Sequence, residues 1–120
     1  MGMIAKELGR GTVTGTTIGT ADTAVTNLTT LDTIVTRITL YNAHTGDVLI
    51  TIGHVPDAAG SVDTMDAADV IYNVTLNTTE TFDIDCKVVL RDTNETIKIF
   101  AGTTAVINYH MYGVTLADQS

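Results

Sequence analysis

Three histidines are the side chains best suited to bind a transition metal, and they are widely separated at His44, His54 and His110. Zinc sites usually draw two of their ligands from positions a few residues apart. No two of these histidines have that spacing, so we predict neither a metal site nor any other cofactor. His54 and His110 are in phase with the inward residues of predicted strands, which favours hydrogen-bonded side chains at the edge of a core.

A second group of candidates is the carboxylate cluster of Asp57, Asp63, Asp66 and Asp69. Carboxylates can bind Ca²⁺, but that ion needs about six converging oxygen ligands or more, and the spacing here does not match an EF-hand loop. We therefore interpret residues 56–68 as an exposed, solvated loop. Its marker residues are Pro56, Asp57, Asp63 and Asp66.

Nucleophilic catalysis would require a serine, threonine or cysteine held against a base, and no sequence motif of that kind is present. Cys86 is the single cysteine, which excludes an internal disulfide and favours a small buried side chain in a protein made in a reducing compartment. Asp83 and Asp85 lie two positions apart, as residues on the polar face of a strand do. We predict that the protein is not an enzyme.

The charge of the chain restricts its partners. It has 120 residues, with 6 Lys+Arg and 14 Asp+Glu, and a formal net charge of −8. Nucleic-acid binding depends largely on clustered Lys and Arg, and anionic membranes attract the same residues, so we predict neither partner. The first ten residues carry Lys6, Glu7 and Arg10 rather than a long apolar run, which argues against a secretory signal. Asn27-Leu28-Thr29 fits the N-glycosylation pattern, but in a threonine-rich chain a chance match is the better explanation.

The elements that must position these side chains are predicted to be strands. The chain contains 24 Thr, 12 Val and 11 Ile, which favour pleated sheet over helix. Apolar and polar residues alternate in most segments, the pattern of strands with one face on a core. The predicted strands are residues 12–18, 24–28, 33–42, 47–55, 69–76, 81–90, 96–101 and 105–116.

The same alternation predicts pairing and register. Residues 33–42 and 47–55 flank a short polar connection ending in Gly46, so we predict that they form a hairpin. In the first of these strands the inward residues are Ile34, Ile38 and Leu40. In residues 81–90 the inward residues are Phe82, Ile84, Cys86, Val88 and Leu90. A slip of one residue there would bury charged side chains, so the register of that strand is firmly set.

Together these patterns predict an all-β protein, a single antiparallel β-sandwich that is jelly-roll-like and has about seven or eight strands. Residues 1–11 lack the alternation and are bounded by Gly9 and Gly11. We expect them to form an extended N-terminal arm, with the sandwich domain covering residues 12–120.

Several short motifs follow one another in a characteristic order along the chain. They are residues 4–9 (IAKELG), 33–42 (TIVTRITLYN), 53–61 (GHVPDAAGS), 70–73 (VIYN), 89–90 (VL) followed by 96–99 (TIKI), and 112–114 (YGV). This order resembles a family of small virion proteins of tailed bacteriophages, which are usually capsid decoration (cement) proteins or other components of the particle surface. The chain departs from that family at residues 91–94 (RDTN), where relatives have a tighter acidic-glycine turn.

The resemblance implies an adhesive role rather than a catalytic one. The implied protein is a homotrimer that decorates and stabilises the outside of the mature capsid by clamping neighbouring major-capsid subunits. It would be made in the host bacterial cytoplasm and located on the capsid exterior of the virion. The N-terminal arm would lie along the shell, with Ile4 and Leu8 as apolar anchors and Lys6 and Arg10 as local positive charge. Many copies would act together, because multivalent attachment raises the effective concentration.

An alternative within the same resemblance is a tail or baseplate module that recognises a host surface. The loop of residues 56–68 would then form the recognition surface, with Tyr72, Tyr109 and Tyr112 available for contacts. The chain contains only two Phe and four Tyr. This small number argues against a carbohydrate ligand, because sugar rings commonly stack on exposed aromatic side chains.

Overall fold

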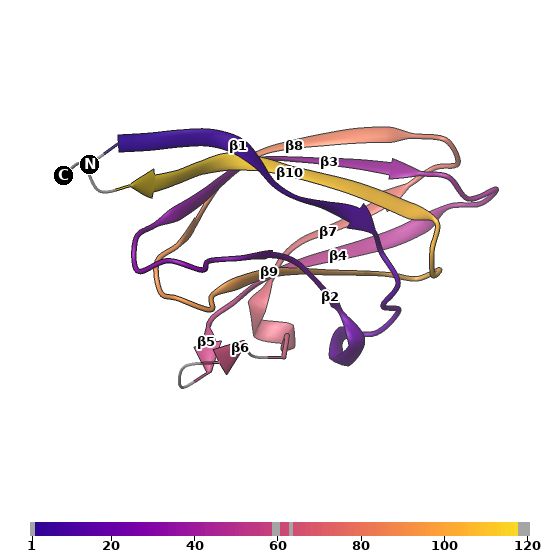
Figure 1. The fold of residues 1–120 in the computed structure, drawn as a ribbon. Coiled ribbons are helices and arrows are strands. Elements are labelled where there is room, and N and C mark those ends of the chain that lie inside the picture. Colours follow the sequence, from indigo (N-terminus) through magenta and orange to yellow (C-terminus); the bar gives the residue numbers. More distant parts are fainter. Residues whose placement is uncertain (1, 59–60, 63, 118–120) are drawn as a thin grey trace.

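Two four-stranded antiparallel sheets pack face to face and enclose the core (Figure 1). The structure is a computed structural model that describes residues 2–58, 61–62 and 64–117, with side chains described for 6–56 and 64–116. Sheet A has the order β1 (Gly2–Thr12), β10 (Ile107–Ala117), β3 (Thr33–Asn42) and β8 (Thr81–Leu90). Sheet B has the order β2 (Asp22–Thr26), β9 (Thr96–Ala101), β4 (Val48–Val55) and β7 (Val70–Leu76). The predicted all-β sandwich is confirmed.

The short elements lie outside the two sheets. The 3₁₀ turn η1 (Ile18–Thr20) precedes β2, and η2 (Ala67–Asp69) precedes β7. Strands β5 (Asp57–Ala58) and β6 (Ser61–Val62) pair only with each other. The strand predicted over residues 12–18 is wrong, because β1 ends at Thr12 and the next element is η1.

The long strands pair from the outside of the sequence inward: β1 with β10, β2 with β9, β3 with β8 and β4 with β7, all antiparallel. This nested order is that of a long antiparallel ribbon rolled into two layers, and it is compatible with the jelly-roll-like winding expected from the sequence. The chain therefore changes sheets between β1 and β2, β2 and β3, β3 and β4, β7 and β8, β8 and β9, and β9 and β10, whereas β4 and β7 both lie in sheet B. The predicted hairpin of residues 33–42 and 47–55 is wrong, because β3 lies in sheet A and β4 in sheet B. The crossing places buried Ile38 and Leu40 in one core with Ile50 and Ile52.

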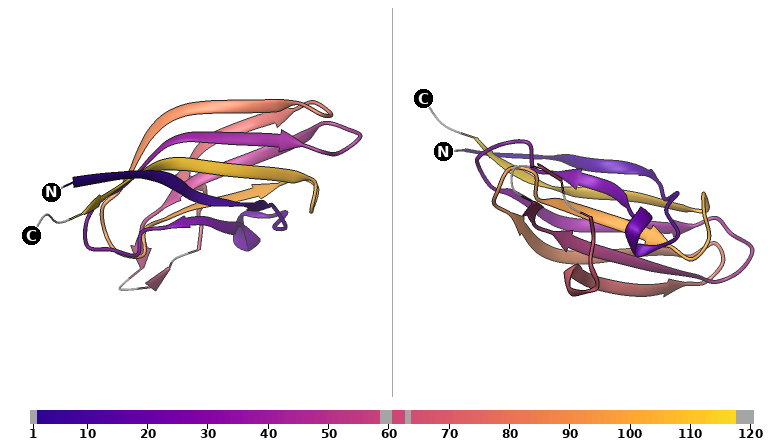
Figure 2. Two further views of the ribbon diagram at one scale, coloured as in Figure 1. Left: turned by 45° about the horizontal axis from the view of Figure 1, so that its top comes forward. Right: turned by 90° about the horizontal axis from the view of Figure 1, so that it is seen from below.

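The N-terminal segment is an edge strand of sheet A rather than an arm. Strand β1 pairs with β10 from Gly2 opposite Ala117 to Thr12 opposite Asn108, so the start of β1 and the end of β10 lie together at one end of the sandwich (Figures 1 and 2). The predicted boundary between residues 1–11 and 12–120 is therefore wrong. The alternation is lost because the register shifts between Glu7 and Gly9, and a bulge reverses the inward and outward faces of a strand.

A second bulge explains an error in the predicted core. The register of β3 against β8 shifts between Val35 and Arg37. As a result Val35 is fully buried, whereas Ile34, predicted to face inward, is only half-buried. Ile38 and Leu40 beyond the bulge are fully buried as predicted. In β8 the inward face is predicted correctly except that Phe82, near the strand end, is 39% exposed.

The two outer faces of the sandwich differ in cover. The segment with β5, β6 and η2 lies on the outer side of sheet B (Figure 1), where Met65 is 2% exposed and its sulfur occupies the space that a Cβ on Gly53 would take. Lys98, the partner of Gly53 on β9, is also buried there. Among the described residues no element covers the outer face of sheet A (Figures 1 and 2). In the part of the chain that the structure describes, this face is therefore accessible to a ligand or partner.

Two fully buried asparagines stabilise, through hydrogen bonds, the connections in which the chain crosses from one sheet to the other. Asn42 ends β3, and its amide nitrogen donates to the carbonyls of Gly46, Leu76 and Asn77 at 3.0–3.1 Å. Its side-chain oxygen accepts from the backbone N–H of His44 at 2.8 Å. One side chain thus joins the β3–β4 connection to the turn between β7 and β8.

Asn27 repeats this arrangement at the other end of the sandwich. Its amide nitrogen donates to the carbonyls of Leu31, Leu90 and Asp92 at 3.0–3.2 Å, and its oxygen accepts from the hydroxyls of Thr29 and Thr33. Because Asn27 is fully buried, it is a structural residue, which agrees with the interpretation of its glycosylation pattern as a chance match.

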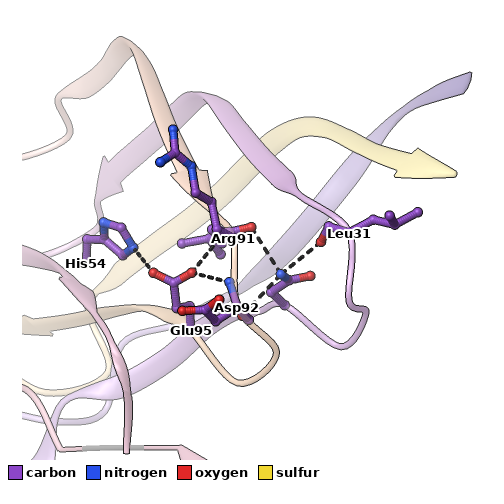
Figure 3. A network of polar contacts seen from close by, with 7 residues as sticks. Leu31, His54, Arg91, Asp92 and Glu95 are labelled. Carbon is purple, nitrogen blue, oxygen red and sulfur yellow. Dashed lines mark hydrogen bonds and ion pairs between the residues drawn. The ribbon is translucent and has the colours of Figure 1, made fainter. Parts of the chain in front are cut away.

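At each of these two connections a glutamate accepts hydrogen bonds from backbone N–H groups of the turn. Glu80 accepts from the backbone N–H of Asn77 at 2.8 Å. Glu95 accepts from the backbone N–H groups of Arg91 and Asp92 with one oxygen, and its other oxygen lies 3.1 Å from His54 Nε2 (Figure 3). The carboxylates satisfy turn N–H groups that have no partner in the strand ladder. Glu95 and His54 therefore have a structural role in the turn.

The residue before each glutamate has a left-handed backbone, with φ of 58° at Thr79 and 74° at Asn94. Asparagine tolerates this conformation, whereas β-branched threonine is strained in it. We expect Thr79→Asn to raise the free energy of unfolding by about 1 kcal/mol, measured by urea denaturation. Thr45→Asn, a change in an exposed turn, is the control and should shift it by less than about 0.5 kcal/mol. Equal shifts in both variants would contradict the strain.

Candidate functional site

The three histidines do not converge. His54 of β4, in sheet B, faces Glu95. His110 of β10 lies in sheet A, where its Nδ1 is 3.2 Å from Glu7 Oε2 on the neighbouring strand β1. His44 lies half-buried in the connection between β3 and β4. In the described ranges no three His, Cys, Asp or Glu side chains form a group that could hold a metal ion.

The acidic segment has a local structural role in the part that is described. The backbone N–H of Asp66 donates to the Asp69 carboxylate at 2.8 Å across η2. Pro56 and Asp66 are exposed. The side chain of Asp57, and Asp63 altogether, lie outside the described residues. What the structure does place is Met65, which fixes this segment against sheet B.

The residues expected on an arm are instead positions of strand β1. Leu8 is half-buried and packs against the core, so it is not free to anchor the protein to another surface. Lys6 and Arg10 are exposed. The side chain of Ile4 lies outside the described residues. Only Arg10 belongs to the cluster of polar side chains described next.

The outer face of sheet A carries an ordered grid of polar and aromatic side chains. Cross-strand pairing from β1 through β10 and β3 to β8 aligns them in three rows. The rows are Thr12, Asn108, Tyr41 and Thr81; Arg10, His110, Thr39 and Asp83; and Glu7, Tyr112, Arg37 and Asp85. Two of the four tyrosines and two of the three arginines of the chain are in this grid. Tyr and Arg are the residues most enriched where proteins bind partners.

Ion pairs and hydrogen bonds fix much of the grid. Asp83 accepts from Thr39 Oγ1 at 2.6 Å and from Arg37 at 2.9 Å. Glu7 lies 3.6 Å from Arg10 Nε and also contacts His110, whose ring is parallel to that of Tyr112 with centroids 6.2 Å apart. The hydrogen bond from Thr39, and next that from Arg37, lower the pKa of the Asp83 carboxyl.

The lowered pKa of Asp83 predicts a pH dependence. A carboxyl whose pKa is lower in the folded state stabilises the fold above its unfolded pKa of about 3.9, and this contribution is lost as the pH falls through the folded pKa. The midpoint of urea unfolding should therefore fall less on acidification in Asp83→Asn than in the unmodified protein. Asp85→Asn, one row away on the same strand, is the matched control. A fall equal to that of the unmodified protein would refute the assignment to Asp83.

An open depression lies within the grid. Its lining is Arg10, Gly11, Thr12, Thr39, Tyr41, Asn108 and His110, and its volume is about 430 Å³. Thr12 Oγ1 donates to Asn108 Oδ1 at 2.7 Å, which holds the Asn108 amide in place. The lining contains hydrogen-bonding groups and two flat rings but no carboxylate. We take this depression as the candidate functional site.

Sequence reasoning missed most of the site. Arg37, Thr39 and Tyr41 were recognisable as one face of a strand. The prediction that His110 is in phase with the inward residues is wrong, because its neighbours Tyr109 and Met111 are buried and His110 lies opposite Thr39 on the outer face. The sequence contains no signal that β3 and β10 are neighbours, because they are joined only through the nested pairing. The expectation that Tyr109 is available for contacts with a host surface is also wrong, because Tyr109 faces the core and is 6% exposed.

The remaining groups of chemical interest face inward. Cys86 donates weakly to the Val35 carbonyl at 3.6 Å, and burial raises the pKa of its thiol. Burial likewise raises the pKa of Tyr72 and of Tyr109. Thiols with a raised pKa are poor nucleophiles, because the thiolate is the reactive form.

The described part of the chain has no helix of the length and hydropathy needed to cross a membrane. In comparisons with known proteins, no family model matches the chain and no curated protein matches its sequence.

Proposed function

We propose that the protein is a structural component of a tailed-bacteriophage particle that decorates the outside of the mature capsid as a homotrimer and clamps neighbouring major-capsid subunits. The proposal rests on the order of sequence motifs and on one structural observation, the uncharged edge strand β7. It includes synthesis in the host cytoplasm, a place on the capsid exterior and no catalytic activity. The net charge of −8 favours an exterior place, because packaged DNA repels acidic proteins.

Strand β7 differs from the other three edges of the sandwich. Strands β1, β2 and β8 all carry charged residues, whereas Val70–Leu76 has none and contains no proline. Among the described strands its one neighbour is β4, and Val70 and Ile71 are 36% and 38% exposed. Natural proteins usually protect such an edge with charges, proline or a covering element. An uncharged edge favours pairing with another chain.

Strand addition at β7 suits a subunit that clamps a shell. Main-chain hydrogen bonds along an edge give affinity, and alternate side chains give specificity. Each contact is small, but the copies of a trimer attach together and raise the effective concentration of one another. The two-layered sandwich supplies a rigid body that links the capsid subunits to which the trimer is attached.

The test is the copy number on purified particles, measured by quantitative mass spectrometry against the major capsid protein. We expect a ratio near one or a simple symmetry fraction of it. The variant Ile71→Lys places a charge on the β7 edge and should lower the copy number by about tenfold or more. Leu49→Lys, on the interior strand β4 with Leu49 48% exposed, is the matched control and should keep the full copy number.

The second candidate is a tail or baseplate module that recognises a host surface. The polar depression on sheet A favours it, because recognition of a ligand needs such a site. A trace ratio to the major capsid protein would overturn decoration of the capsid and favour this station.

A further inference from the structure

We infer that the depression on the outer face of sheet A is a saccharide-binding site. The inference goes beyond the proposed function, since a site on this face is available wherever the subunit is attached to the particle. It uses none of the residues of the β7 edge.

The first argument is the pair of rings in the lining. Tyr41 on β3 and His110 on β10 belong to adjacent rows of adjacent strands, so they flank the depression as diagonal neighbours. Both are half-buried, which leaves part of each ring uncovered. The parallel ring of Tyr112 supports His110 from outside the depression. Flat rings of this kind suit the C–H faces of a sugar.

The second argument is the set of polar groups around those rings. Six of the seven lining residues have hydrogen-bonding side chains. Within the described residues no hydrogen bond occupies the Asn108 amide nitrogen or the Tyr41 hydroxyl, and Arg10 is engaged only through Nε. Amide and guanidinium groups donate, while hydroxyls both donate and accept. This mixture matches a ligand whose hydroxyls also do both.

The same lining argues against other ligands. A hard cation would need several carboxylate or carbonyl oxygens, and the described lining has no carboxylate. An apolar ligand would leave the polar groups without partners. Nucleic acid is disfavoured because Glu7 and Asp83 lie beside the depression in the same face. The chain has few Phe and Tyr side chains, but one of its four tyrosines, Tyr41, lines this depression together with the ring of His110.

The test has two stages. The intact protein is first screened on an array of bacterial surface glycans, and the saccharides that bind are then titrated into the ¹⁵N-labelled protein with glycerol as the reference for non-specific hydroxyl effects. We expect saturable shifts confined to residues 10–12, 39–41 and 108–110. Tyr41→Ala should weaken binding by about tenfold. Asp85→Ala is the control, because Asp85 lies on the same face but outside the lining, and it should bind with unchanged affinity.

The outcomes separate cleanly. No saturable binding on the array, shifts no larger than those with glycerol, or shifts located elsewhere would each overturn the inference. If Tyr41→Ala loses its dispersed amide spectrum, Asn108→Ala takes its place with the same expected loss. The copy number on particles is measured separately, so failure of the saccharide site leaves the capsid proposal standing, and the reverse also holds.

Discussion

Asn27→Ala should lower the free energy of unfolding by about 3–5 kcal/mol, a loss large enough to unfold much of a marginally stable domain. The side chain is fully buried and its amide donates to three carbonyls drawn from two separate connections. Removing it leaves those carbonyls and the hydroxyl of Thr33 without their partner, and each buried unsatisfied group costs about 1–3 kcal/mol. Urea denaturation followed by circular dichroism measures the loss.

The isosteric variant Asn27→Asp distinguishes hydrogen bonding from packing. It keeps the volume but replaces the donor by an acceptor that faces the carbonyls of Leu31, Leu90 and Asp92, so we expect it to be at least as destabilising as alanine at neutral pH. Asn108→Ala, a change at a half-buried surface asparagine, is the control and should cost less than about 1 kcal/mol. A loss below that value in both Asn27 variants would show that the crossing does not depend on this side chain.

Deletion of residues 1–11 should abolish the cooperative unfolding transition. The deletion removes β1, which pairs with β10 along almost its whole length, and it removes Leu8 from the core. Strand β10 would then become an edge strand. Tyr109 would also lose its packing against Gly11, which is so close that a Cβ added to Gly11 would lie 3.1 Å from the Tyr109 hydroxyl. Near-ultraviolet circular dichroism during heating measures the effect. A truncated protein with the original melting temperature would restore the arm interpretation.

A point variant tests the contribution of β1 to stability without a deletion. A Cβ on Gly9 would lie 2.1 Å from the Ala24 carbonyl oxygen of β2, so Gly9→Val should separate β1 from the neighbouring sheet and destabilise the fold by about 3 kcal/mol. The double variant Lys6→Ala and Arg10→Ala removes the exposed charges of the strand and should leave stability within about 1 kcal/mol. Together they separate strand packing from surface charge.

The sequence was sufficient to identify most strands but not their neighbours. Thr81–Leu90 is predicted with its correct ends and nearly correct inward face, because period-two alternation is a local property of a half-buried strand. The connection at residues 43–47 has turn chemistry that serves equally for a hairpin or for a crossing between sheets. That choice depends on which apolar face is buried against which, and this is decided by residues far away in the sequence.

The candidate site was hidden for the same reason. Its side chains come from β1, β10 and β3, and the alignment of Arg10 with His110 and Thr39 exists only after the nested pairing has formed. The bulges next to Glu7 and Val35 change the phase of their strands with no marker in the alternation itself. Asn27 and Asn42 likewise look like ordinary polar residues at strand ends until the crossings surround them.

The nested pairing also determines when the protein can fold during synthesis. Strand β1 leaves the ribosome before the other strands of the sandwich, yet its partner β10 ends at Ala117, so β1 waits until all of those strands have been synthesised. The 105 residues from the end of β1 at Thr12 to the end of β10 at Ala117 (117 − 12 = 105) take roughly 5–21 s at about 5–20 residues per second. Sheet A can therefore close only after Ala117 has left the ribosome, and until then the nascent chain carries an unpaired strand that neighbouring ribosomes on the same message also expose.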